Sequence, residues 1–151
     1  ESLHARWQAD TLSLRPDALS ILVGINDAFI QRSVDPALYY DGYADTYRML
    51  LRQFRGFYPG AALVLMEPFV LDAGNHDYLP EVLPHLRRKQ EEVRALAGEF
   101  DAVFVPLQAR FEAAARRAPA AHWLSDSVHP TPAGHALIAE AWLADTKEFF
   151  K

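Results

Sequence analysis

An aspartate and a histidine three positions apart, Asp126 and His129, are the strongest candidates for catalytic chemistry in the sequence. In an irregular segment, a carboxylate at this spacing can reach the imidazole Nδ1–H, fix the tautomer of the ring and stabilise the imidazolium that forms when Nε2 accepts a proton. Pro130 disfavours helical backbone at His129, so we expect the pair to lie just before a helix that begins at Thr131-Pro132. The alternative interpretation is a capping loop at the surface with no catalytic role.

A second candidate motif, Gly24-Ile25-Asn26-Asp27, directly follows a short apolar run. The carboxyl end of a parallel strand is where open α/β sheets place their ligand crevice. An asparagine there can donate its side-chain NH₂ to a developing oxyanion, and the preceding glycine lets the backbone approach closely. The alternative interpretation is ordinary turn chemistry, since glycine, asparagine and aspartate all favour turns.

The elements that must position these residues follow from hydrophobic periodicity. Short runs rich in branched residues predict buried strands, and longer segments with apolar residues three and four apart predict helices. The expected strands span residues 18–24, 61–66 and 102–105, and the expected helices span residues 3–14, 36–58, 80–98, 108–118 and 131–149. Strands that alternate with helices in this way predict a parallel sheet covered on both sides. No repeat or linker interrupts the pattern, so residues 1–151 are expected to form a single domain.

Composition narrows the class of protein. The chain has 151 residues, of which 50% are hydrophobic and 23% charged, as in an ordinary globular domain. A formal net charge of −5, with no basic run longer than Arg87-Arg88-Lys89, disfavours nucleic-acid binding. No apolar segment approaches the length of a membrane span. The absence of cysteine excludes disulfides, thiolate metal sites and a cysteine nucleophile.

In combination, the two motifs resemble the SGNH (GDSL) esterase/acylhydrolase family. The resemblance rests on Gly24-Ile25-Asn26-Asp27 after the strand and on Asp126-Ser127-Val128-His129-Pro130-Thr131-Pro132-Ala133-Gly134-His135 before the last helix. Arg15-Pro16-Asp17 before the first strand, Tyr58-Pro59-Gly60-Ala61 before the second and Met66-Glu67-Pro68 at its end are also similar to the family. The segments occur in the family's order and cover nearly the whole chain.

The resemblance implies a three-layer α/β/α flavodoxin-like parallel sheet and serine-dependent hydrolysis of carboxylic esters. We expect no cofactor. The resemblance also implies that Asn26, next to Gly24, donates to the oxyanion, that His129 is the general base and then the general acid, and that Asp126 orients His129. Ser127 stands where family members usually carry glycine, a departure that we expect to be tolerated. The expected substrate is a small acyl ester, with an acetylated carbohydrate as the favoured example.

One departure from the family is large. Family members begin with a strand that ends in a Gly-Asp-Ser nucleophile motif, and none of the six serines of this sequence follows Gly-Asp or lies in a Gly-x-Ser-x-Gly elbow. The nucleophile therefore stays unassigned, and we expect the chain to be the carboxyl-terminal two-thirds of a domain whose first strands are missing. The strand at residues 19–23 would then have an unpaired edge. We expect that edge to associate with the amino-terminal piece, a second copy or another chain.

A non-catalytic protein is the alternative function. Such a protein would keep the SGNH-like fold and bind a ligand or partner through the same crevice. Any targeting signal would lie in the missing piece, so the sequence leaves the cellular location undetermined.

A group of polar residues after the second strand raises the question of a metal site. It comprises Asp72, Asn75, His76, Asp77 and His85. Oxygen and nitrogen ligands of these types can bind metals, but their spacing matches no metal motif. We therefore expect a polar rim beside the crevice and no metal.

Overall fold

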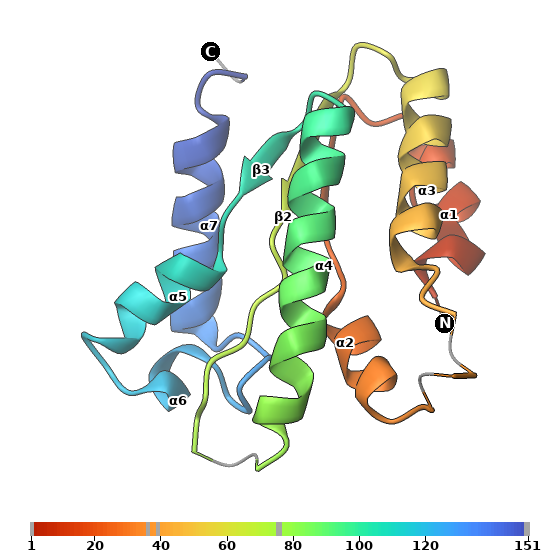
Figure 1. The fold of residues 1–151 in the computed structure, drawn as a ribbon. Helices are drawn as coiled ribbons and strands as arrows, with labels where there is room; N and C mark the ends of the chain where they lie inside the picture. The colour runs from red at the N-terminus through yellow and green to blue at the C-terminus, as the bar shows by residue number, and fades with distance from the viewer. Residues whose placement is uncertain (1, 36, 39, 75–76, 150–151) are drawn as a thin grey trace.

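Three short strands run parallel at the centre of the molecule (Figure 1). They are β1 (Ala18–Leu22), β2 (Ala62–Met66) and β3 (Val103–Val105), and they lie in the order β1-β2-β3. The register places Ser20 beside Val64 and Val64 beside Val103. This computed structural model describes residues 2–35, 37–38, 40–74 and 77–149.

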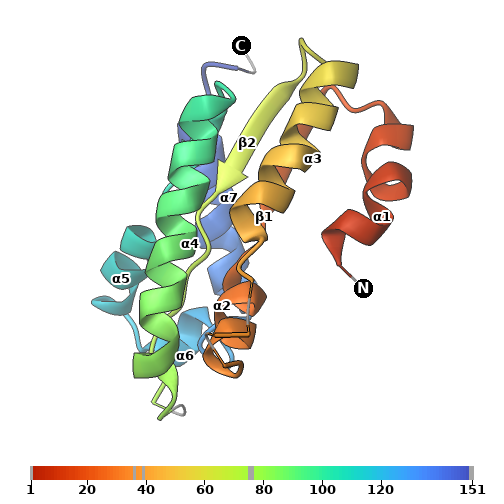
Figure 2. The same ribbon diagram turned by 45° about the vertical axis from the view of Figure 1, so that its right-hand side comes forward.

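Helices cover both faces of the sheet, which gives three layers (Figures 1 and 2). One face is covered by α1 (Leu3–Asp10), α3 (Tyr43–Phe57) and α4 (Leu79–Glu99). The other is covered by α5 (Gln108–Ala115), α6 (Ala120–Trp123) and α7 (Pro132–Thr146). Because successive strand residues point to opposite faces, Leu63 and Leu65 pack with the first group of helices and Val64 with the second. The three-layer α/β/α architecture predicted from the sequence is confirmed.

The main correction concerns the chain that follows β1. No helix was expected between residues 24 and 36, but Gly24 leads directly into a helix, α2 (Ile25–Arg32), and β1 ends at Leu22 rather than at residue 24. Gly24 has a φ of 121°, a conformation that side chains rarely adopt, and this turn ends the strand and starts the helix. The helix expected over residues 36–58 begins only at Tyr43, while positions 36 and 39 lie outside the described residues.

The other helices differ from expectation mainly at their ends. As expected, α7 begins at Pro132 with Thr131 as its N-cap, whose hydroxyl accepts the N–H of Gly134. The first, fourth and last of the expected helices end earlier than the sequence indicates, at Asp10, Ala115 and Thr146. The first helix is followed by a 3-10 turn (Leu12–Leu14), which ends at Arg15 in a left-handed conformation with a φ of 50°. The one-turn helix α6 was not expected.

Strand β1 forms one edge of the sheet. Within the described ranges it pairs with β2 alone. On the face covered by α7, the hydroxyl of Ser20 accepts the indole N–H of Trp142 at 2.8 Å. The backbone groups along the outer edge of β1 are therefore available to a further strand.

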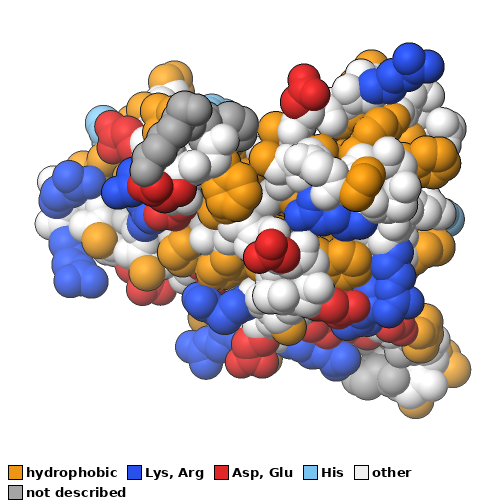
Figure 3. Space-filling view, turned by 90° about the horizontal axis from the view of Figure 1, so that it is seen from above, with side chains coloured by type: hydrophobic (Ala, Val, Ile, Leu, Met, Phe, Trp, Pro, Cys, Tyr) orange, Lys and Arg blue, Asp and Glu red, His pale blue; other side chains and the backbone are white. Residues whose placement is uncertain are grey.

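The surface at the amino end of the strands carries charges of both signs. Figure 3, which views the molecule from that end, shows basic and acidic side chains interspersed between apolar ones. Within the part of the chain that the structure describes, none of the helices combines the length and the apolar character that crossing a membrane requires.

Candidate active site

The loop that precedes α7 holds Asp126 and His129 in direct contact. Oδ2 of Asp126 lies 2.7 Å from Nδ1 of His129, and Oδ1 accepts the backbone N–H of His129 at 2.9 Å. Both hydrogen bonds lower the pKa of the Asp126 carboxyl, and the bond from the His129 backbone has the larger effect. An ionised carboxylate on Nδ1 leaves Nε2 as the proton acceptor of the ring. The side chain of His129 is 76% exposed, so a reacting group can approach it.

Backbone contacts fix this loop at its two ends. Leu124 and Pro130 form an isolated antiparallel bridge, and the N–H of Ser125 donates to the carbonyl of His129 at 2.9 Å. Beyond the loop, Gly134 lies so close to α6 that a Cβ would stand 2.1 Å from the carbonyl oxygen of Trp123. The first turn of α7 therefore needs a glycine there to pack against α6.

Ser127 occupies the position where the resemblance led us to expect glycine, and its backbone explains that preference. Its φ is 75°, in the left-handed region where a side chain is strained. The side chain is buried, and its hydroxyl accepts the N–H of Ala73 at 3.1 Å, while the carbonyl of Ser127 accepts the N–H of Leu71 at 3.0 Å. The serine thus ties the Asp126–His129 loop to the segment that follows β2, which compensates for the backbone conformation.

Replacing Ser127 with alanine should lower the free energy of unfolding by about 1–2 kcal/mol, because the strained φ stays and the Ala73 N–H loses its acceptor. Ser127→Gly should cost less, since glycine relieves the strain. Ser125→Ala is the control: its hydroxyl is exposed, and the loss should stay within about 0.5 kcal/mol. Urea denaturation measures all three variants. Equal losses for Ser125→Ala and Ser127→Ala would contradict the prediction.

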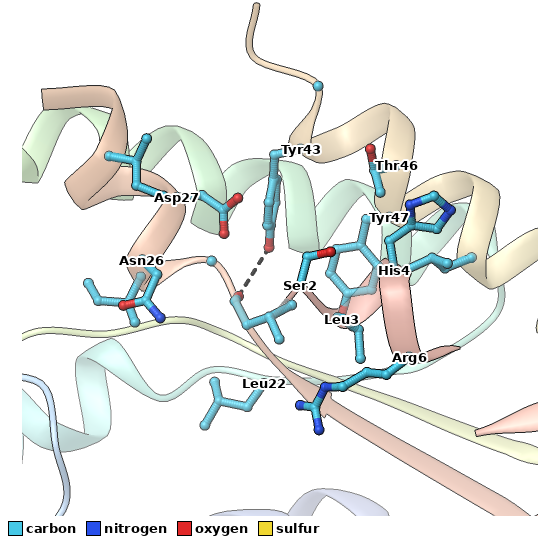
Figure 4. A pocket seen from close by; sticks show the side chains of 16 residues that line it. Ser2, Leu3, His4, Arg6, Leu22, Asn26, Asp27, Tyr43, Thr46 and Tyr47 are labelled. Carbon is cyan, nitrogen blue, oxygen red and sulfur yellow. Dashed lines mark hydrogen bonds between the residues drawn. The ribbon is translucent and has the colours of Figure 1, made fainter. Parts of the chain in front are cut away.

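Asn26 lies in the first turn of α2, at the carboxyl end of β1. Gly24 is the N-cap of this helix, and its carbonyl accepts the N–H of Ala28 at 3.1 Å. Asn26 and Gly24 line a cavity of about 640 Å³ between α1, α2 and α3, and Figure 4 shows the side chain of Asn26 at its edge. The side chain of Asn26 is exposed, so its amide is accessible to a ligand.

The two motifs meet at one end of the sheet. Val128, from the Asp126–His129 loop, packs against the same apolar cluster as Ile25 and Phe29 from α2. The members of that cluster are Ala28, Val70, Leu79, Val82 and Leu86. In Figure 1 both α2 and the loop before α7 lie at the lower end, where the strands finish. The cavity is lined by Asn26 and by neither Asp126 nor His129, so it lies beside β1 and not over the Asp126–His129 pair.

The six serines lie in the described part of the chain, and the hydroxyl of each has a hydrogen-bond partner other than the ring of His129. The partners are the N–H of Ala5 for Ser2, Gln8 for Ser13, the indole of Trp142 for Ser20, the carbonyl of Phe29 for Ser33, the carbonyl of His129 for Ser125 and the N–H of Ala73 for Ser127. The nucleophile stays unassigned.

The set of polar residues that was considered as a metal site is only partly described, because Asn75 and His76 lie outside the described residues. In residues 2–35, 37–38, 40–74 and 77–149, no three histidine, aspartate or glutamate side chains are grouped so that they could hold a metal ion. Oδ1 of Asp72 accepts the N–H of Gly74 at 2.7 Å, which is an ordinary turn contact.

Sequence reasoning missed one buried charge near the site. Lys89, which was assigned to a basic run, is fully buried and lies against the ring of Tyr43. One signal was available: Lys89 falls on the apolar stripe of α4, three residues after Leu86 and four before Val93.

The molecule has a three-layer α/β/α fold, with a histidine–aspartate pair at the carboxyl end of its parallel strands. This combination of fold and side chains is that of an SGNH-type hydrolase. The profile of the GDSL-like Lipase/Acylhydrolase family matches residues 1–137, and the chain belongs to this family.

Known relatives agree with this membership. An acetylxylan esterase of Geobacillus stearothermophilus is 31% identical over 147 residues, which cover 95% of this chain and 65% of the relative. A crystal structure of that enzyme superimposes with a TM-score of 0.77 over 95% of this chain and 65% of the other, at 31% identity. The structure of a protein described as a GDSL-like lipase, from Parabacteroides merdae, reaches 0.87 at 35% identity over 96% of this chain and 66% of the other. The chain thus spans slightly less than two-thirds of the length of these relatives.

Proposed function

We propose that this protein is a carboxylic ester hydrolase of the GDSL type, to which the chain contributes His129, Asp126 and Asn26. The observation that carries the proposal is the 2.7 Å contact between Asp126 Oδ2 and Nδ1 of an exposed His129. Family membership supports the reaction class. Asn26 lies in the first turn of α2, and the position of α2 at the same end of the sheet (Figure 1) supports the role of Asn26 as oxyanion donor.

The reaction would proceed in two steps. A serine hydroxyl attacks the ester carbonyl while Nε2 of His129 takes its proton, and Asp126 stabilises the imidazolium. The side-chain amide of Asn26 donates to the tetrahedral oxyanion, which collapses and expels the alcohol with a proton from His129. Water then attacks the acyl-serine with His129 as general base, and the carboxylic acid and the free serine are released.

The serine, in this proposal, comes from a strand that ends in Gly-Asp-Ser and pairs with the outer edge of β1. Two observations support this arrangement. Each described serine hydroxyl has another partner, and β1 pairs only with β2 among the described residues. A strand beside β1 would end near Asn26, because parallel strands finish at the same edge of a sheet.

We infer an acetylated carbohydrate as substrate. The support is the acetylxylan esterase relative, of which catalytic variants at a serine, an aspartate and a histidine have been solved. The aspartate and the histidine of that enzyme are three positions apart, as Asp126 and His129 are. A shared spacing supports a shared role for the pair.

The test compares the protein at its natural length with residues 1–151 expressed alone, on p-nitrophenyl acetate and acetylated xylo-oligosaccharides. The natural-length protein should hydrolyse both and react with a fluorophosphonate at one serine. Residues 1–151 alone should hydrolyse near background. Rapid turnover by residues 1–151 would show that one of the six serines is the nucleophile, and no hydrolysis by either protein would favour the non-catalytic alternative.

A further inference from the structure

Tyr43, at the start of α3, contacts the backbone that leads into the oxyanion motif. Its hydroxyl donates to the carbonyl of Val23 at 3.1 Å, the hydrogen bond drawn as a dashed line in Figure 4. A Cβ on Gly24 would stand 2.7 Å from the same hydroxyl oxygen. The ring therefore lies directly against the peptide that joins β1 to α2.

That peptide needs an anchor from elsewhere in the chain. Gly24 has no side chain, and its φ of 121° lies in a region where glycine moves between several conformations at little cost. Asn26 follows two residues later in the first turn of α2, so the orientation of the peptide sets the direction of its side chain. In the described residues, Tyr43 is the one side chain that hydrogen-bonds the carbonyl of Val23.

The ring of Tyr43 is itself held in place by a buried charge. Nζ of Lys89 lies 4.8 Å from the ring centroid, and Lys89 is fully buried. Its ammonium is 2.5 Å and 2.6 Å from the two carboxylate oxygens of Asp41 and 3.4 Å from Glu92. Burial raises the pKa of the Asp41 carboxyl, but the hydrogen bonds and the charge of Lys89 outweigh burial and lower it. The Asp41 carboxyl thus stays ionised, and its contacts hold the lysine on the ring.

The hydroxyl of Tyr43 is a permanent donor. Burial, and after it the nearby Tyr47 and Asp27, raises the pKa of the Tyr43 hydroxyl far above its ordinary value. The hydroxyl therefore keeps its proton at neutral pH and remains a donor to the carbonyl of Val23.

We propose that Tyr43 is a positioning residue for Asn26: by fixing the Val23–Gly24 peptide, it holds the asparagine amide in the direction of the oxyanion. This inference rests on the proposed function. Tyr43 acts through the backbone and donates no hydrogen bond to the substrate.

The chain offers a matched control for this role. Tyr47 lies one turn further along α3, is also buried, and its ring meets that of Tyr43 edge-on at 5.7 Å. Its hydroxyl has no hydrogen-bond partner among the described residues. Tyr43→Phe and Tyr47→Phe therefore remove the same atom from neighbouring buried rings, and only the first removes the contact with Val23.

The experiment uses the protein at its natural length and p-nitrophenyl acetate. Tyr43→Phe should lower kcat about tenfold with little change in KM, whereas Tyr47→Phe should change kcat less than about twofold. In an Asn26→Ala background, Tyr43→Phe should cost less than about twofold more, since a positioning residue has nothing left to position. The ¹³C resonance of the Val23 carbonyl should shift in Tyr43→Phe and not in Tyr47→Phe. Both variants are compared at a temperature where circular dichroism shows them folded.

The outcomes separate this inference from the function on which it rests. An unmodified protein that hydrolyses no ester contradicts the proposed function, and the Val23 resonance still tests the anchor. Equal kcat values for Tyr43→Phe and Tyr47→Phe in an active enzyme that needs Asn26 would overturn the inference. Fully additive effects of Tyr43→Phe and Asn26→Ala would overturn it as well, because Tyr43 would then act independently of Asn26.

Discussion

Replacing His129 with alanine should reduce kcat for ester hydrolysis at least about 10⁴-fold in the natural-length protein. The imidazole is the only group that takes the serine proton and returns it to the leaving alcohol in the proposed mechanism. Asp126 acts through this ring, whose Nδ1 lies 2.7 Å from its carboxylate. Removal of the ring therefore also removes the contribution of Asp126 to catalysis. The measurement is steady-state kinetics on p-nitrophenyl acetate.

His135→Ala is the control for this substitution. His135 also lies in the segment shared with the family, but it is exposed in the first turns of α7, and its backbone N–H donates to the carbonyl of Thr131. Its replacement should leave kcat within about twofold. Because His129 is largely exposed, His129→Ala should keep nearly all of the stability of the parent, which urea denaturation can check. A kcat for His129→Ala close to that for His135→Ala would exclude His129 as the general base.

Local sequence was enough to predict the Asp126–His129 contact. Three residues of irregular chain, closed by Pro130, leave few ways to arrange the pair, and the structure confirms the hydrogen bond. The start of α7 was equally predictable, because Thr131 and Pro132 each supply a helix-start signal that depends on no distant residue.

The region after β1 was harder to predict, because its residues carry two signals at once. Glycine, asparagine and aspartate favour turns, but aspartate also favours the first turn of a helix, where Asp27 lies. With eight residues and one fully buried side chain, Ala28, the helix α2 shows too little periodicity to decide between the two. The φ of 121° at Gly24, which joins the strand to the helix, is a property of the folded chain.

The apolar stripe of α4 places Lys89 on a buried face, but the ion pair that stabilises it there depends on contacts that no local pattern contains. Its partner Asp41 lies 48 positions earlier in the chain, and the ring of Tyr43 comes from a different helix. The two arginines beside Lys89 indicate the opposite, an exposed basic face, and the paired carboxylate is needed to decide between the two signals. Such a long-range ion pair becomes visible only when α3 and α4 are packed together.

Replacing Asn26 with alanine should lower kcat about 10²–10³-fold, the usual cost of removing one oxyanion donor. The loss should fall on kcat and leave KM nearly unchanged, because the amide interacts with charge that develops only in the transition state. Asn26 is exposed, so the alanine variant should fold as the parent does.

Asn26→Asp separates hydrogen-bond donation from side-chain shape. The aspartate keeps the size of the side chain and its place in the first turn of α2, where a carboxylate is favourable, but it has no N–H to donate and places a negative charge near the oxyanion. It should therefore lose at least as much activity as Asn26→Ala. If the aspartate variant retained parental kcat, the oxyanion would be held by other donors, and Asn26 would serve only to begin the helix after β1.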